Sequence, residues 1–185
     1  MKQYKIIILL IVVSIFSCSK KNQVNDIVFD SSFNGARLNS IKNLGDNKYI
    51  AKINPASEPV NKSPYFAFSV IAKSEKEIEL QLDYGKYKHR YIPKLSFDKK
   101  TWKNIEASKI KIDTSTGIAT LKLTVLPQKL YVAAQEIETS QDTYLWLDSM
   151  LSKHQFLKKE IAGKTVKKHN NYIVRSTNNT KKGIA

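Results

Sequence analysis

Apolar and polar residues alternate with a period of two along much of the chain between residues 27 and 136. In EIELQLDY, residues 77–84, every second side chain is apolar, which is typical of a half-buried antiparallel strand. IATLKLTV, residues 118–125, repeats the alternation directly after a turn that ends at Gly117. Further strands are expected at 37–43, 48–53, 65–72, 94–97 and 130–135. Because these strands are short and separated by turn-forming clusters, the pattern predicts an antiparallel β-sandwich over residues 27–136.

The period of the pattern changes at Thr139. Thr139 and Asp142 have the spacing of a capping box, and apolar residues then recur at helical spacing as far as Leu151. Two strand-like segments follow, at 156–161 and 172–174. We therefore expect a mostly β protein, in which the sandwich is followed, in residues 137–185, by one amphipathic helix and an incomplete α/β segment.

The amino terminus has the features of a targeting segment. Lys2 and Lys5 precede an apolar stretch at residues 6–16, and the tetrapeptide Ile-Phe-Ser-Cys that ends at Cys18 resembles the lipobox of bacterial lipoproteins. We expect residues 1–17 to be a lipoprotein signal peptide, Cys18 to be lipidated, and residues 18–26 to be a linker. The alternative is an uncleaved membrane anchor, but the 11 residues of this stretch fall short of the ~20 that span a bilayer. The expected location is the bacterial cell envelope, with the membrane contacted through Cys18.

Composition restricts the chemistry and the partners further. Cys18 is the only cysteine, which excludes a disulfide within the chain and a cysteine-based zinc site. The formal charge is +15, and its 31 Lys and Arg residues are scattered along the whole length, which is typical of a solvated surface. In a cytosolic protein such a charge would suggest nucleic acid. For a lipid-anchored protein we expect no nucleic-acid partner.

Candidate catalytic residues are absent from the sequence. The three histidines, His89, His154 and His169, form neither an H-x-x-E nor an H-x-x-x-H spacing, and no G-x-S-x-G, P-loop or G-x-G-x-x-G motif occurs. The stretch 84–102 interleaves aromatic with basic residues, a mixture that suits stacking and anion binding but also an aromatic-rich sheet edge. We take as a candidate interdomain or ligand surface the residues Tyr87, His89, Arg90, Tyr91 and Lys94.

Three segments carry a family resemblance. FDSSFNGARL (29–38), SPYFAFSV (63–70) and KHRYIPKLSFDKKTW (88–102) resemble, in that order, the amino-terminal β-sandwich domain of zinc carboxypeptidases of the cytosolic-carboxypeptidase-like branch. YVAAQEIETSQDTYLWLDSM (131–150) is similar to the link into the catalytic domain of that family, and EIAGKTVKKHNNYIV (160–174) to its first strands.

The second part of the resemblance is incomplete. Where the family carries Gly-x-Ser-x-x-Gly-Arg, this chain matches at Gly163 and conservatively at Thr165, but Lys168 and His169 replace the glycine and arginine. The resemblance implies that the zinc ligands, on an H-x-x-E motif, would follow residue 185. We therefore expect a chain truncated before its zinc site, with no cofactor of its own and no catalysis alone.

The resemblance implies a function for the whole enzyme, which is the removal of carboxy-terminal residues from peptides by metal-assisted hydrolysis. The expected partners are the missing catalytic domain, or a second chain that supplies it, and a peptide substrate. Without that domain, Leu145, Trp146, Met150 and Phe156 are expected to form an exposed apolar patch. The alternative is a lipid-anchored sandwich that binds a peptide or glycan through residues 84–102.

Overall fold

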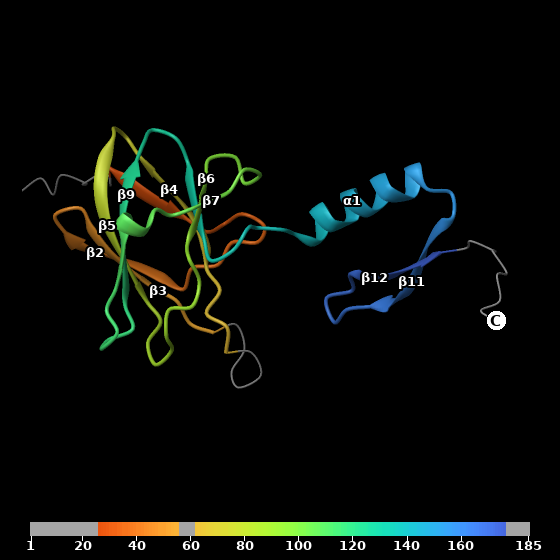
Figure 1. The fold of residues 1–185 in the computed structure, drawn as a ribbon, viewed down its shortest axis with the longest axis horizontal. Helices are drawn as coiled ribbons and strands as arrows, with labels where there is room; N and C mark the ends of the chain where they lie inside the picture. Colours follow the sequence, from red (N-terminus) through yellow and green to blue (C-terminus); the bar gives the residue numbers. More distant parts are fainter. Residues whose placement is uncertain (1–25, 56–61, 177–185) are drawn as a thin grey trace, which may run out of the picture.

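The computed structural model describes residues 26–55 and 62–176. Cys18 and residues 183–185, on which several of the sequence predictions rest, lie outside the described residues. Figure 1 shows an elongated molecule in which two sheets face one another at one end, and a helix with a two-stranded hairpin lies at the other end. Over the described residues, the prediction of a mostly β fold with one α-helix is confirmed.

The sandwich consists of two five-stranded sheets. The first sheet has the order β1-β4-β10-β6-β7, with all neighbours antiparallel. Its strands are β1 (Ile27–Asp30), β4 (Ala67–Ala72), β10 (Leu130–Ala133), β6 (Lys94–Ser96) and β7 (Lys103–Asn104). The second sheet has the order β2-β3-β5-β9-β8. Its strands are β2 (Ser40–Gly45), β3 (Lys48–Lys52), β5 (Lys76–Asp83), β9 (Ala119–Val125) and β8 (Ile110–Ile112), and the 3₁₀ turn η1 (Ala107–Lys109) precedes β8.

One strand pair departs from the antiparallel prediction. β3 and β5 are parallel, with Ile50 opposite Gln81. The reason is the path of the chain, which leaves the second sheet after β3, forms β4 in the first sheet, and returns as β5 in the direction of β3. A parallel pair needs such a crossover, which the local hydrophobic pattern does not reveal.

The strand expected at residues 37–43 also lies further along the chain, because β2 spans Ser40–Gly45. Asp46 and Asn47 both have positive φ, 50° and 58°, which is the backbone of a tight two-residue hairpin turn between β2 and β3. This turn fixes the register so that Gly45 lies opposite Lys48. Arg37 instead forms an isolated bridge with Ala67 of β4.

The core lies between the two sheets and consists of the apolar faces that the period-two pattern predicts. On β5 the buried side chains are those of Ile78, Leu80 and Leu82, and on β9 every second residue from Ala119 is buried. The first sheet contributes Phe68, Val70, Leu130 and Val132 to the same cluster, and Phe66, just before β4, also belongs to it. Fully burying one such side chain stabilises the fold by about 1.5–3 kcal/mol.

The helix α1 (Ser140–Lys153) begins where the sequence predicts. Thr139 Oγ1 accepts from the backbone N–H of Asp142 at 3.3 Å, and the backbone N–H of Thr139 donates to Asp142 Oδ2 at 2.8 Å. These two bonds complete the predicted capping box. Among the described residues, no helix is both long and apolar enough to cross a bilayer.

The helix packs on the hairpin of β11 (Leu157–Lys164) and β12 (Asn170–Ser176). Tyr144 contacts the ring of Tyr172 edge to face, with 5.2 Å between centroids, and its hydroxyl donates to the carbonyl of Asn170 at 2.9 Å. Lys159 of β11 forms an ion pair with Asp148 of the helix. The helix and hairpin therefore form one small unit at the end of the molecule.

Candidate functional site

Three of the five residues of the candidate surface, His89, Tyr91 and Lys94, make side-chain contacts within the sandwich. His89 Nδ1 lies 2.9 Å from the Tyr84 hydroxyl, and the Tyr91 hydroxyl lies 2.6 Å from Ser63 Oγ. Lys94 Nζ reaches Glu136 Oε1 at 3.3 Å and Asn104 Oδ1 at 3.2 Å. These contacts tie the segment 84–94 to different parts of the sandwich.

The remaining two residues of this surface are Tyr87 and Arg90. Tyr87 is half-buried against the core, the ammonium of Lys86 lies 5.4 Å from its ring centroid, and Arg90 is exposed. Burial raises the pKa of the Tyr84 hydroxyl and lowers the pKa of His89. The Tyr84–His89 pair is therefore uncharged near neutral pH, which suits a packing role for His89.

Metal-binding residues are not clustered in the part of the chain that the structure describes. No group of three His, Cys, Asp or Glu side chains there is placed to hold a metal ion. A catalytic zinc needs three converging protein ligands, so no zinc ligand is assigned to any described residue.

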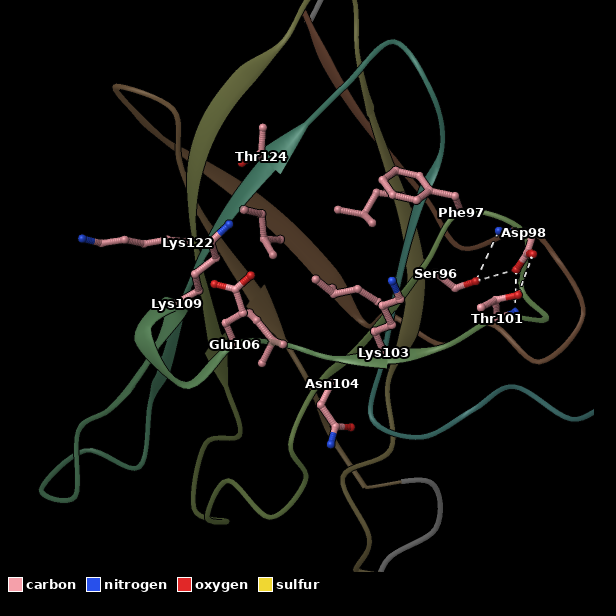
Figure 2. Close-up of a pocket in the computed structure, with 14 residues that line it drawn as sticks. Ser96, Phe97, Asp98, Thr101, Lys103, Asn104, Glu106, Lys109, Lys122 and Thr124 are labelled. Carbon is pink, nitrogen blue, oxygen red and sulfur yellow. Dashed lines mark hydrogen bonds between the residues drawn. The ribbon is translucent and has the colours of Figure 1, made fainter.

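A cavity of about 420 Å³ opens on the side of the sandwich where both sheets have their edge strands, β7 and β8 (Figure 2). Its apolar walls come from both sheets and from the segment after β7: Leu95, Phe97, Ile105, Leu123 and Leu130. Lys103, Glu106 and Lys109 also line it. Sequence reasoning placed residues 95–102 in the dense aromatic and basic stretch but did not predict this cavity, because its walls come from β6, β7, β9 and β10.

One wall of the cavity is a tight loop, with Ser96, Asp98 and Thr101 in the lining, and this loop is held by one carboxylate. Asp98 Oδ1 accepts from the backbone N–H groups of Lys100 and Thr101, both at 2.7 Å, and from Ser96 Oγ at 3.0 Å. These bonds, which Figure 2 shows in part, lower the pKa of Asp98. The loop is thus ordered by its own hydrogen bonds.

Apolar side chains are exposed on the unit of α1, β11 and β12. Leu145 and Trp146 on α1 are 60% and 61% exposed, and Phe156 is 40% exposed. Met150, expected to join them, is half-buried. Further exposed apolar residues of the hairpin are Ile161, Val166, Ile173 and Val174. Three of the four residues expected in the apolar patch are therefore exposed, and Met150 is not.

Comparison with known proteins gives the fold class. No protein-family model matches the sequence, and no curated protein matches it. Among solved structures, the chain is similar to a metallo-carboxypeptidase from Burkholderia cenocepacia, with a TM-score of 0.67 and 12% identity over 80% of this chain and 38% of that one. It is also similar to a metallo-carboxypeptidase from Pseudomonas aeruginosa solved with (2-guanidinoethylmercapto)succinic acid, with a TM-score of 0.61 and 12% identity over 80% of this chain and 39% of that one.

The chain thus has a fold found in bacterial metallo-carboxypeptidases and spans about two-fifths of their length. A share of 80% of 185 residues is more than residues 1–136 can supply. The likeness therefore extends beyond the sandwich into the unit of α1, β11 and β12.

Proposed function

We propose that this chain is the amino-terminal accessory module of a zinc metallocarboxypeptidase of the cytosolic-carboxypeptidase-like branch. The observation that carries the proposal is a likeness to bacterial metallo-carboxypeptidases that includes both the sandwich and part of the segment after residue 136. The enzyme as a whole would remove carboxy-terminal residues from peptides. In such an enzyme zinc lowers the pKa of its bound water, and the zinc site would lie in protein sequence outside this chain.

The unit of α1, β11 and β12 would join this module to the catalytic domain. Leu145 and Trp146 on α1 and Ile173 on β12 expose apolar surface that a neighbouring sheet or helix layer would bury. The catalytic domain would be supplied by further sequence or by a second chain. The module itself would not hydrolyse peptides.

The proposal is tested by asking whether zinc-dependent peptidase activity co-purifies with this protein. The tagged protein is purified from membranes of the cells that produce it, and release of the last residue of model peptides is measured with and without a zinc chelator. We expect chelator-sensitive activity to co-purify, and to be lost for Leu145→Asp and Trp146→Asp. Val28→Asp is the matched control, because Val28 is also more than half exposed but lies on the sandwich edge strand β1.

Two results would contradict the accessory role. One is chelator-sensitive peptide hydrolysis by the purified chain after every other protein has been removed. The other is the absence of peptidase activity from a preparation in which the wild-type chain is intact and folded.

We also propose that the protein is anchored in the bacterial envelope through a lipid on Cys18. The support is the lipobox-like tetrapeptide that ends at this residue. Mass spectrometry of the mature protein should find the acyl modification at an amino-terminal Cys18, and Cys18→Ser should release the protein from the membrane fraction. Recovery of unmodified Cys18 within an uncleaved chain would overturn the anchor.

A further inference from the structure

The cavity at the edge of the sandwich has two kinds of lining. Its floor is apolar and reaches the core, since Leu123, Leu130 and Ile105 are buried residues that also line it. Phe97 is 48% exposed at the same cavity. A volume of about 420 Å³ is within the range of pockets that hold small molecules, roughly 300–1,000 Å³.

Five charged residues line the cavity, and three of them lie on one segment of chain. Of the other two, Asp98 accepts hydrogen bonds from its own loop, and Lys122 lies on β9. Figure 2 shows the segment from β7 to η1 running along one side of the cavity, with Lys103, Glu106 and Lys109 on it. This side has two cations and one anion. None of the three takes part in an ion pair with any described residue, so both ammonium groups are available to a ligand.

A third lysine provides an internal comparison. Lys122 lies on β9 between the buried residues Leu121 and Leu123, so strand alternation directs its side chain to the outer face of the sheet. Figure 2 shows this side chain extending away from the other lining residues. Lys122 therefore forms part of the cavity wall, but its ammonium group points away from the cavity.

We propose that this cavity binds a small apolar carboxylate, with the hydrocarbon chain between the sheets and the carboxylate at Lys103 and Lys109. The apolar floor favours the chain, because burial of each methylene contributes about fourfold in affinity. The surplus of one positive charge on the β7 to η1 segment favours an anionic end over a neutral one. The site lies in the sandwich and is independent of the proposed carboxypeptidase role.

The occupant follows from the same features. A nucleotide or a sugar phosphate would leave the floor of Leu123 and Leu130 uncovered and would place polar groups against it. A purely apolar ligand would leave the two ammonium groups without a partner. An unbranched carboxylic acid satisfies both parts of the lining.

The test uses isothermal titration calorimetry of the purified protein in detergent-free buffer with octanoate, hexanoate and octanol. We expect octanoate to bind, and hexanoate to bind about fifteenfold more weakly because two methylenes are missing. Octanol should bind about threefold to fivefold more weakly than octanoate because the charge is absent. Backbone amide shifts in nuclear magnetic resonance spectra should move at Ser96, Phe97 and Thr124, which line the cavity.

Substitutions then locate the two ends of the ligand. The double variant Lys103→Gln with Lys109→Gln should weaken octanoate about threefold to fivefold and leave octanol unchanged. Phe97→Ala should weaken both ligands. Lys122→Gln is the matched control, since it removes the same charge from a side chain that points away, and it should change neither. An unchanged urea midpoint shows that each variant is folded.

Three results would overturn the proposal. The first is no heat and no amide shifts with octanoate. The second is equal affinity for octanoate and octanol, which would leave the carboxylate without a role. The third is an equal loss of octanoate affinity in Lys122→Gln and in the Lys103 and Lys109 double variant, which would indicate attraction to the overall charge of the protein and not a built site.

Discussion

The Tyr84 hydroxyl lies 2.9 Å from Nδ1 of His89, in a pair held against the core of the sandwich. Burial lowers the pKa of His89 below its ordinary value of 6.5 and raises the pKa of Tyr84. Near neutral pH the Tyr84 hydroxyl can therefore donate to an unprotonated Nδ1, provided that Nε2 carries the proton of the imidazole. Protonation of His89 removes this acceptor.

This pair predicts a pH dependence of stability. The pKa of His89 is lower in the folded state than in the unfolded state. As the pH falls below the ordinary pKa of histidine, His89 is therefore protonated in the unfolded state before it is protonated in the folded state. The free energy of unfolding should therefore decrease as the pH is lowered from about 7 to about 5.5. Urea unfolding at several pH values measures this slope.

Substitution of the histidine isolates its part of the slope. His89→Gln should flatten it over this interval, since Gln does not titrate. His169→Gln is the control, because the side chain of His169 is exposed in the loop between β11 and β12, and it should leave the slope as in the wild type. An unchanged slope in His89→Gln would contradict the assignment.

The sequence predicted the elements whose signals are local. The alternation in β5 and β9 follows from one face of each strand meeting the core, and the Thr139 and Asp142 spacing fixes the start of α1 within one turn. Neither the alternation nor the capping-box spacing depends on which strands are neighbours in the sheet. These parts of the fold were therefore predictable from the residues alone.

What the sequence did not predict depends on contacts between distant residues. The parallel pairing of β3 with β5 requires the detour through β4. The hydroxyl of Tyr91, a residue of the candidate surface, is hydrogen-bonded to Ser63, 28 residues away. Nothing in the pattern around either residue indicates the other. The cavity escaped prediction for the same reason, since Phe97 and Leu123 meet there from different sheets.

The core should be far more sensitive than the surface of the same hairpin. Leu121 on β9 is fully buried, whereas Ile112 on β8 is 49% exposed. Leu121→Ala should reduce the free energy of unfolding by about 2–5 kcal/mol, because it leaves a cavity between the sheets. Ile112→Ala should change it by about 0.5 kcal/mol or less. Chemical unfolding followed by tryptophan fluorescence compares the two, and similar losses would show that the described core is not the one that stabilises the protein.

The turn between β8 and β9 should be sensitive to acid. Asp113 accepts from Ser115 Oγ at 2.6 Å and from the Ser115 backbone N–H at 2.9 Å, which lowers the pKa of Asp113 from 3.8 to about 2. Because the folded-state pKa is depressed, the stabilisation is present above the ordinary value and is lost as the pH falls from 3.8 toward 2. Asp113→Asn should remove this part of the acid sensitivity, with Asp46→Asn in the turn between β2 and β3 as the control. An acid transition that is identical in the Asp113 variant and the wild type would contradict the assignment.

Gly35 of the sandwich lies against Ile137, in the segment that leads into α1. Its φ is +82°, and a β-carbon built there would lie 2.6 Å from Cγ2 of Ile137. Gly45 has a similar φ of +88°, but a β-carbon there would meet nothing within 4 Å. Substitution of either glycine by alanine therefore forces a side chain into a left-handed backbone conformation. Only at position 35 does the new β-carbon also collide with Ile137.

Substitution of both glycines by alanine separates these effects. Gly45→Ala should cost roughly 1–2 kcal/mol from the left-handed backbone alone, and Gly35→Ala should cost about 1–3 kcal/mol more because Ile137 or the backbone must move. Replacing Ile137 by Ala removes the obstructing methyl group. The double variant Gly35→Ala with Ile137→Ala should then be more stable than the sum of the two single losses predicts, and this excess measures the contact. Additive losses would mean that residue 35 and residue 137 do not touch.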